Sequence, residues 1–69
     1  MTLGSRIKQH RQDKGLNMRE FGELIDNASD SIVSRWEKDI SKPNVKRLKL
    51  IADDMNITVT ELLNGSDKT

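Results

Sequence analysis

The stretch SDSIVSRWEKDISKP, residues 29–43, predicts a short surface helix whose two sides differ in chemistry. At about 100° per residue, the apolar residues on one side are Ile32, Val33 and Trp36. The opposite side carries Ser31, Ser34 and Lys38, with Asp30 and Arg35 at its borders. Ser29 can cap the start of this helix, and Pro43 cannot continue it. We therefore expect the apolar side to anchor in a core and the small, cationic side to stay free for a partner.

Four further helices flank this stretch, and each begins at a residue type that caps helix N-termini. The predicted N-caps are Thr2, Asn17, Asn44 and Thr58. The first helix should run to about Lys14, with Gly15 as its left-handed stop, and the fourth should end at Asn56. Asn64 and Gly65 end the last helix. The turn between the second and third helices is made by Asp26, Asn27, Ala28 and Ser29, of which Asp and Asn tolerate left-handed backbone.

The predicted core consists of apolar residues that repeat at helical spacing. They are Leu3 and Ile7, then Phe21, Leu24, Ile25 and Ala28, then Ile40, then Val45, Leu48, Ile51, Ala52 and Met55, and finally Val59, Leu62 and Leu63. Glycine inside a helix costs about 1 kcal/mol, so at Gly22 we expect the third helix to pass close by. The sequence thus predicts an all-α fold, a compact bundle of five short helices with a helix-turn-helix. Residues 1–64 form its single domain and residues 65–69 a flexible C-terminal tail.

The composition restricts the class of protein. A chain of 69 residues suffices for one small domain, and with no Cys it has neither disulfides nor a cysteine metal site. No apolar run is long enough for a membrane span, and the N-terminal MTLGSRIKQH carries charge where a signal peptide would be apolar. We therefore expect a soluble, cytoplasmic protein without a membrane partner.

The net charge of +1 hides an uneven distribution along the chain. Residues 6–19 and 35–49 each carry a net charge of +4, whereas residues 20–34 carry −4 and residues 50–69 carry −3. Two basic blocks that meet in the fold would make a charged face suited to a polyanion. Ordinary solvated helix surfaces are the alternative explanation.

Catalytic and metal-binding patterns find little support in the sequence. His10 is the single imidazole, and neither a second metal ligand nor a nucleophile–base set can be assembled around it. The four glycines are too scattered for a phosphate-binding loop. Asp53 and Asp54 are interpreted as a solvated face. We expect no enzyme activity, no cofactor, no metal and no small-molecule ligand.

Several motifs together resemble the Cro and phage-repressor type of helix-turn-helix family, also called the xenobiotic-response-element type. These motifs are LNxxEFG from Leu16, SxVSRWEK from Ser31, KP at Lys42 and ITVxELL from Ile57. The resemblance covers residues 3–64 and implies a lambda-repressor-like DNA-binding domain of five helices. In that fold the second and third helices form the DNA-binding motif, and the third lies in the major groove.

Roles follow from the resemblance residue by residue. It implies contacts with base edges or adjacent phosphates from Asp30, Ser31, Ser34 and Arg35. It implies contacts with the DNA backbone from Asn17, Met18, Lys38, Ser41, Lys42 and Asn44. Proximity to the loop of residues 39–44, which follows the third helix, adds Lys46 as a phosphate candidate. Arg11 and Glu37 match a pair that joins the first helix to the third in this family, which is a structural role.

The individual DNA-facing residues have alternative interpretations. Arg35 can donate to guanine O6 and N7 together, or contact a phosphate instead. Ser31 and Ser34 can bond bases or phosphates, or be tolerated small surface residues. Asp30 departs from what DNA favours because an acid repels phosphates; it suits the helix dipole but can also accept from cytosine N4. A turn one residue longer than the common family pattern precedes the third helix.

Two functions from different classes remain open at this point. The first is a small sequence-specific DNA-binding transcriptional regulator, a phage or mobile-element Cro-like repressor associated with the nucleoid of a bacterial cell. Its partner would be double-stranded operator DNA, and it could form a homodimer. The second is a helix-turn-helix protein that mainly binds another phage regulator and modulates its repression. Candidate dimer or partner contacts are Leu50, Ile57, Leu62 and Leu63, which could instead close the core.

Overall fold

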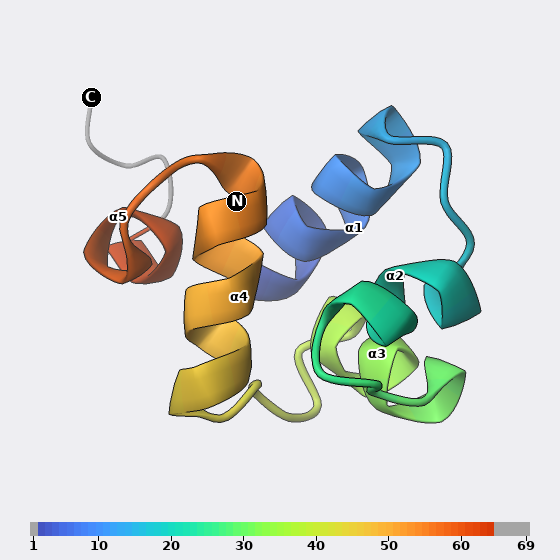
Figure 1. The fold of residues 1–69 in the computed structure, drawn as a ribbon. Coiled ribbons are helices and arrows are strands. Elements are labelled where there is room, and N and C mark those ends of the chain that lie inside the picture. The colour runs from blue at the N-terminus through green and yellow to red at the C-terminus, as the bar shows by residue number, and fades with distance from the viewer. Residues whose placement is uncertain (1, 65–69) are drawn as a thin grey trace.

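The computed structural model describes residues 2–64, which form five α-helices and no strand (Figure 1). The helices are α1 (Leu3–Asp13), α2 (Met18–Leu24), α3 (Asp30–Glu37), α4 (Val45–Met55) and α5 (Val59–Asn64). α1 packs on α3, α2 packs on α3, and α5 packs on α4. The predicted all-α bundle is confirmed, and the predicted tail of residues 65–69 lies outside the described residues.

The predicted N-caps are all present. Side-chain oxygens of Thr2, Asn17, Ser29 and Asn44 accept hydrogen bonds from backbone amides three residues on. Thr58 and Glu61 form a reciprocal capping box, with distances of 3.0 Å and 2.9 Å. At the other ends, Gly15 and Asn56 adopt left-handed backbone with φ of 72° and 62°. These local signals explain why the helix boundaries follow the sequence so closely.

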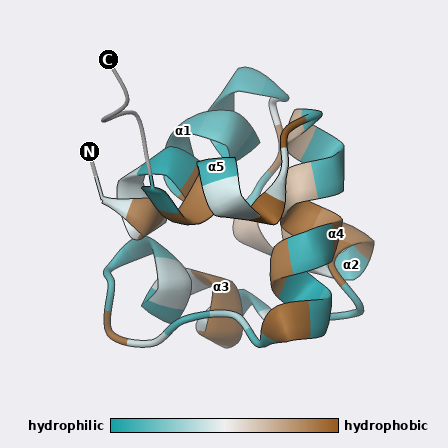
Figure 2. Cartoon of the chain, turned by 90° about the vertical axis from the view of Figure 1, so that its left-hand side faces the viewer, coloured by the Kyte–Doolittle hydropathy of each residue, from teal (hydrophilic) through white to brown (hydrophobic). Residues whose placement is uncertain are grey.

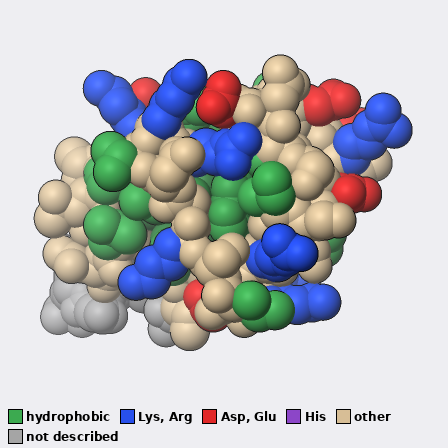
Figure 3. Space-filling model, turned by 90° about the horizontal axis from the view of Figure 1, so that it is seen from below, with side chains coloured by type: hydrophobic (Ala, Val, Ile, Leu, Met, Phe, Trp, Pro, Cys, Tyr) green, Lys and Arg blue, Asp and Glu red, His purple; other side chains and the backbone are tan. Residues whose placement is uncertain are grey.

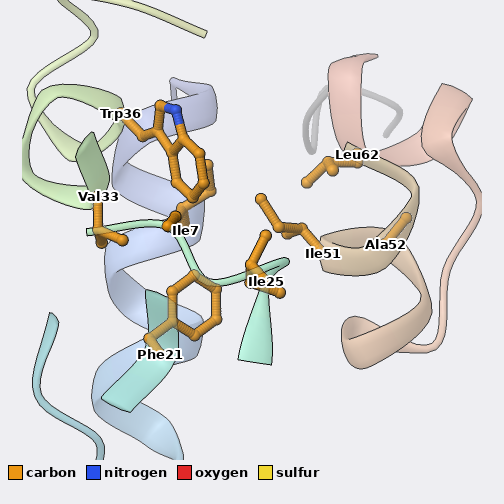
Figure 4. Packing of buried hydrophobic residues seen from close by; sticks show 9 residues of the cluster. Ile7, Phe21, Ile25, Val33, Trp36, Ile51, Ala52 and Leu62 are labelled. Carbon is orange, nitrogen blue, oxygen red and sulfur yellow. The ribbon is translucent and has the colours of Figure 1, made fainter. Parts of the chain in front are cut away.

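The core lies where all five helices meet (Figure 4). Its buried residues are Ile7, Phe21, Ile25, Ala28, Val33, Trp36, Ile51, Ala52 and Leu62. Val33 is 0 % and Trp36 2 % exposed, so the inward side of α3 is confirmed. Hydrophobic and hydrophilic residues alternate around the helices, as packing on one side requires (Figure 2). Within residues 2–64 no helix is both long and apolar enough to cross a membrane.

Two of the predicted core positions, Leu24 and Val45, are wrong. Leu24 is 52 % exposed because α2 ends there, and the non-helical backbone of Ile25 (φ −108°, ψ 69°) turns Ile25 into the core instead. Val45 is 80 % exposed. It is the first residue of α4, nearly two turns before the helix reaches its buried residues Ile51 and Ala52.

Ile40 and Leu63 were also expected inside and are not. Ile40 is 69 % exposed, because the left-handed backbone of Asp39 (φ 60°) turns the loop after α3 away from the core. Leu63 is 49 % exposed and its neighbour Leu62 is fully buried. On a short helix two adjacent residues point about 100° apart, so only one of them reaches the core.

Glycine permits two close approaches. A Cβ on Gly22 would overlap the carbonyl oxygen of Ala28 and meet Val33 Cγ2 at 3.2 Å. The expected close contact is therefore present, but the backbone nearest to it belongs to the turn before α3. A Cβ on Gly4 would overlap the carbonyl oxygen of Trp36. No sequence pattern indicates this second contact, which brings the N-terminus of α1 against the end of α3.

Candidate nucleic-acid interface

An open groove with a volume of about 690 Å³ runs between the start of α2 and the outward side of α3. The residues that line it are Asn17, Met18, Arg19, Asp30, Ser31, Ser34, Arg35, Lys38 and Ile40. The structure thus brings together all four residues expected at base edges and three of those expected at the DNA backbone. Arg19 and Ile40 were missed. For Arg19, its positive charge beside Met18 could have indicated a place in the groove. Ile40 had been assigned to the core.

Within the described residues, the polar side chains on the outward side of α3 have no intramolecular partners. Asp30, Ser31 and Arg35 are exposed and Ser34 is half-buried. Within residues 2–64 their side chains form no hydrogen bond or ion pair with other residues. Because the described part of the chain does not use these polar groups, they are available to a ligand in the groove.

The orientation of α3 is fixed by the ion pair between Arg11 of α1 and Glu37 of α3. Arg11 Nε and Nη2 donate to the two carboxylate oxygens of Glu37 at 2.6 Å and 3.1 Å. The two side chains are only 11 % and 3 % exposed. The hydrogen bond with Glu37 raises the pKa of Arg11, with burial opposing this. Arg11 Nη1 also donates to the carbonyl oxygen of Leu16 at 2.9 Å, so one guanidinium joins α1, α3 and the segment before α2.

The loop after α3 carries Ser41 and Lys42, both exposed but outside the groove lining. Pro43 is buried and holds the far end of this loop. Asn44 uses its Oδ1 to cap α4 by accepting from Arg47 N at 2.9 Å, and Asn17 Oδ1 caps α2 in the same way. The side-chain amide nitrogen of each Asn can still donate a hydrogen bond to an anion.

Lys46 and Arg47 lie beside the turn between α2 and α3. Lys46 Nζ is 3.5 Å from Asp26 Oδ1, in an exposed pair. Lys46 does not line the groove. Arg47 is half-buried. Its guanidinium lies 6.0 Å from the centre of the Trp36 ring, and Nη2 donates to the carbonyl oxygen of Asp26 at 3.3 Å. Arg47 therefore covers the indole and fastens α4 to the turn.

The apolar residues proposed as dimer contacts have different environments. Leu62 is fully buried and packs in the core beside α4, in agreement with the alternative that it closes the core. Leu50 and Ile57 are half-buried and pack against the core. Of the four, Leu63 is the most exposed.

Asp54 was interpreted as a solvated residue, and this is also wrong. Asp54 Oδ2 accepts from His10 Nε2 at 2.6 Å, and Lys14 Nζ lies 3.1 Å from both carboxylate oxygens. We call these three residues the Asp54 cluster. Burial acts to raise the pKa of Asp54, but the hydrogen bonds from His10 and Lys14 outweigh it, so the pKa is lowered. The cluster joins α1 to α4, and no spacing rule in the sequence connects residues 44 positions apart.

The surface around the loop between α3 and α4 has mixed chemistry. Seen from below, Lys and Arg side chains are interspersed with hydrophobic and acidic ones (Figure 3). The two basic blocks of the sequence thus do not merge into a uniformly positive face on this side. Any recognition of a polyanion here depends on placed groups more than on overall charge.

Comparisons with known proteins agree with this architecture. A family described as Helix-turn-helix matches residues 7–62. The fold is similar to that of the P22 c2 repressor, whose crystal structure was determined in complex with a synthetic operator. The TM-score is 0.85 at 23% sequence identity, covering 96% of this chain and 98% of that one.

Three relatives are similar over nearly the whole chain. The HTH-type transcriptional regulator SinR of Bacillus licheniformis is 32% identical over 97% of this chain and 60% of its own length. ImmR of Bacillus subtilis (strain 168), also an HTH-type transcriptional regulator, is 31% identical over 99% and 52%. The HTH-type transcriptional activator BcrR of Enterococcus faecalis is 30% identical over 97% and 32%. The chain thus spans between about a third and three fifths of the length of these relatives. With its five helices, its groove at α2 and α3 and the match over residues 7–62, the chain belongs to the Cro and phage-repressor type of helix-turn-helix family.

Proposed function

We propose that this chain binds double-stranded DNA in a sequence-specific manner and regulates transcription, with α3 in the major groove. One observation carries the proposal: the inward side of α3 is anchored by Val33 and Trp36, while the polar groups of Ser31 and Arg35 face an open groove and have no partner among residues 2–64. A helix about 10–12 Å in diameter fits a major groove of about 12 Å width. The family membership and the names of the relatives support the same function.

Base reading is assigned to α3. Arg35 would donate to O6 and N7 of a guanine, which is worth about 1–3 kcal/mol of discrimination. Ser31 and Ser34 are short enough to allow close approach and can hydrogen-bond either base edges or phosphates. Asp30 would accept from cytosine N4.

Phosphate contacts are assigned to groups around the groove. They are Asn17, Met18, Lys38, Ser41, Lys42, Asn44 and Lys46. The side-chain amides and lysines among them donate to phosphate oxygens, whereas Met18 offers its backbone amide. Lys46 must exchange its pair with Asp26 for a phosphate, at little cost because that pair is exposed.

The biological setting proposed is a bacterial cell, with the chain bound at the nucleoid as a repressor of phage or mobile-element type. Residues 1–64 would act as one domain and residues 65–69 as a tail. Members of this family often bind half-sites about 34 Å apart as two-fold pairs. Leu63, with the partly covered Leu50 and Ile57, would supply the contact between two copies.

The decisive experiment measures DNA affinity for duplexes enriched from a random pool, by fluorescence anisotropy over a range of salt concentrations. Arg35→Ala should relax preference at one base pair. Lys42→Ala should weaken binding to all sequences and reduce the salt slope by about one. Lys49→Ala, which removes an exposed charge from α4 and not from the loop that carries Lys42, is the matched control. Equal effects from all three variants, or binding without salt dependence, would contradict groove reading.

A second candidate function follows from the exposed Asp30 at the start of α3. An acid there disfavours phosphates but suits a basic protein, so the same surface could bind another regulator and modulate its repression. The variant Asp30→Lys separates the two functions. It should raise general DNA affinity if DNA binds directly, and should weaken binding to a basic regulator if the second function holds.

A further inference from the structure

Asp39, the second residue after α3, joins the following loop to the N-terminus of α1. Its Oδ1 accepts a hydrogen bond from Gly4 N at 2.9 Å, between residues 35 positions apart. Hydrogen bonds from the Thr2 side chain and the Gly4 amide lower the pKa of Asp39, and the nearby charge of Lys42 adds to this. The carboxylate is therefore held in its charged, accepting form.

Gly4 makes this contact possible because it has no side chain. A Cβ at this position would lie 2.7 Å from the Glu37 carbonyl oxygen and 2.8 Å from Asp39 Oδ1, in addition to the overlap with Trp36. Only glycine lets the first turn of α1 approach the end of α3 so closely. The hydrogen bond to Asp39 thus belongs to a tightly fitted junction between α1 and α3.

The backbone of the loop follows from this junction. Asp39 adopts left-handed backbone with φ of 60°. The amides of Ile40 and Ser41 then turn back to the Arg35 carbonyl oxygen, at 3.0 Å and 3.4 Å. With Asp39 held at one end and Pro43 buried at the other, the direction in which Ser41 and Lys42 leave the protein is set by the fold.

We infer that Asp39 is a positioning residue for DNA binding, which fastens the loop to α1 so that Ser41 and Lys42 meet the phosphates beside the major groove. This inference rests on the proposed function. Charge alone would argue against an acid here, because Asp39 repels the phosphates that Lys42 attracts. If charge alone mattered, removing the Asp39 side chain would strengthen DNA binding. A positioning role predicts that losing the hydrogen bond to Gly4 N weakens DNA binding, and this difference in sign makes the inference testable.

The experiment compares Asp39→Gly with Asp39→Asn, using the enriched duplexes and the anisotropy assay. The two variants have the same net charge and both tolerate left-handed backbone. They differ in that Asn keeps an oxygen that can accept from Gly4 N. We expect Asp39→Asn to bind at least as tightly as the unsubstituted chain. Asp39→Gly should bind about three- to tenfold more weakly than Asp39→Asn, the loss that one hydrogen bond explains.

A double-mutant cycle with Lys42→Ala distinguishes positioning from a general loss of stability. In the Asp39→Gly background Lys42 is already poorly placed, so Lys42→Ala should cost less affinity than in the Asp39→Asn background. A role in overall stability would leave the effect of Lys42→Ala the same in both.

Equal affinities of the Gly and Asn variants, or equal Lys42 effects, would overturn the inference and leave the proposed function standing. If the unsubstituted chain fails to bind any duplex, the proposed function falls, and the inference with it.

Discussion

Two ionic contacts hold the C-terminal half of α1, and they differ in burial and in geometry. On one side Arg11 meets Glu37 of α3 through two hydrogen bonds, with both side chains nearly covered. On the other side His10 and Lys14 share Asp54 of α4, where Lys14 is 41% and Asp54 24% exposed. Water and salt reach the Asp54 cluster more readily than the Arg11–Glu37 pair. The Arg11–Glu37 pair therefore holds α3 against α1 more firmly than the Asp54 cluster holds α4 against α1.

This difference bears on the proposed function. A helix that reads base edges must keep its side chains in a fixed position relative to the groups that contact phosphates. The buried, two-pronged pair joins α3 to α1, and α1 also meets the loop after α3 through Asp39. By contrast, α4 carries Lys46 as a proposed phosphate contact and none of the residues assigned to base edges. The Arg11–Glu37 pair, the better covered of the two contacts, thus holds the helix whose side chains must be placed accurately on the bases.

The largest expected effect is that of Glu37→Ala. It leaves the Arg11 guanidinium covered without its carboxylate, which costs about 3 kcal/mol or more. This is comparable to the total stability of a domain of this length, about 3–10 kcal/mol. Urea unfolding followed by circular dichroism checks the prediction. Arg11→Lys is the control, because it keeps the charge but loses the two-pronged geometry and should cost less. A loss below about 1 kcal/mol for Glu37→Ala would show that the two contacts are equivalent.

An intermediate effect is expected for Asp54→Asn, about 1 kcal/mol at pH 6. Because the pKa of Asp54 is lowered in the folded chain, its contribution is present above the unfolded pKa of about 3.9 and is lost as the pH falls through the folded value. Thermal unfolding of both proteins between pH 6 and pH 2 measures this. The stabilities of the unsubstituted chain and of Asp54→Asn should converge at the acid end. A constant difference between them would mean that the carboxylate charge does not contribute to the stability.

The smallest effect is expected for Lys14→Ala, at most about 0.5 kcal/mol, since the ammonium group is well exposed. The same unfolding measurement at low and high salt should show the difference shrinking as salt is added. If Lys14→Ala were as costly as Asp54→Asn, the lysine would be the main partner of Asp54 and His10 a minor one.

Helix positions and the two sides of α3 were predictable because they depend on local rules. The N-caps Thr2, Asn17 and Asn44 act on backbone amides three residues away. Val33 and Trp36 differ from Ser31 in phase around a single helix. The composition of the groove beside α3 was largely predictable too, but through the family resemblance and not through spacing.

The helices, their ends and the amphipathic character of α3 thus follow from the amino-acid sequence alone, because each depends on interactions within a few residues. The exposure of Leu24, Ile40 and Val45 could be learned only from the folded chain. The tertiary structure also decided the partners of Asp39 and Asp54, which lie 35 and 44 residues away along the chain. The physical reason is that periodicity specifies a direction around one helix axis, whereas contacts between helices depend on how those axes cross.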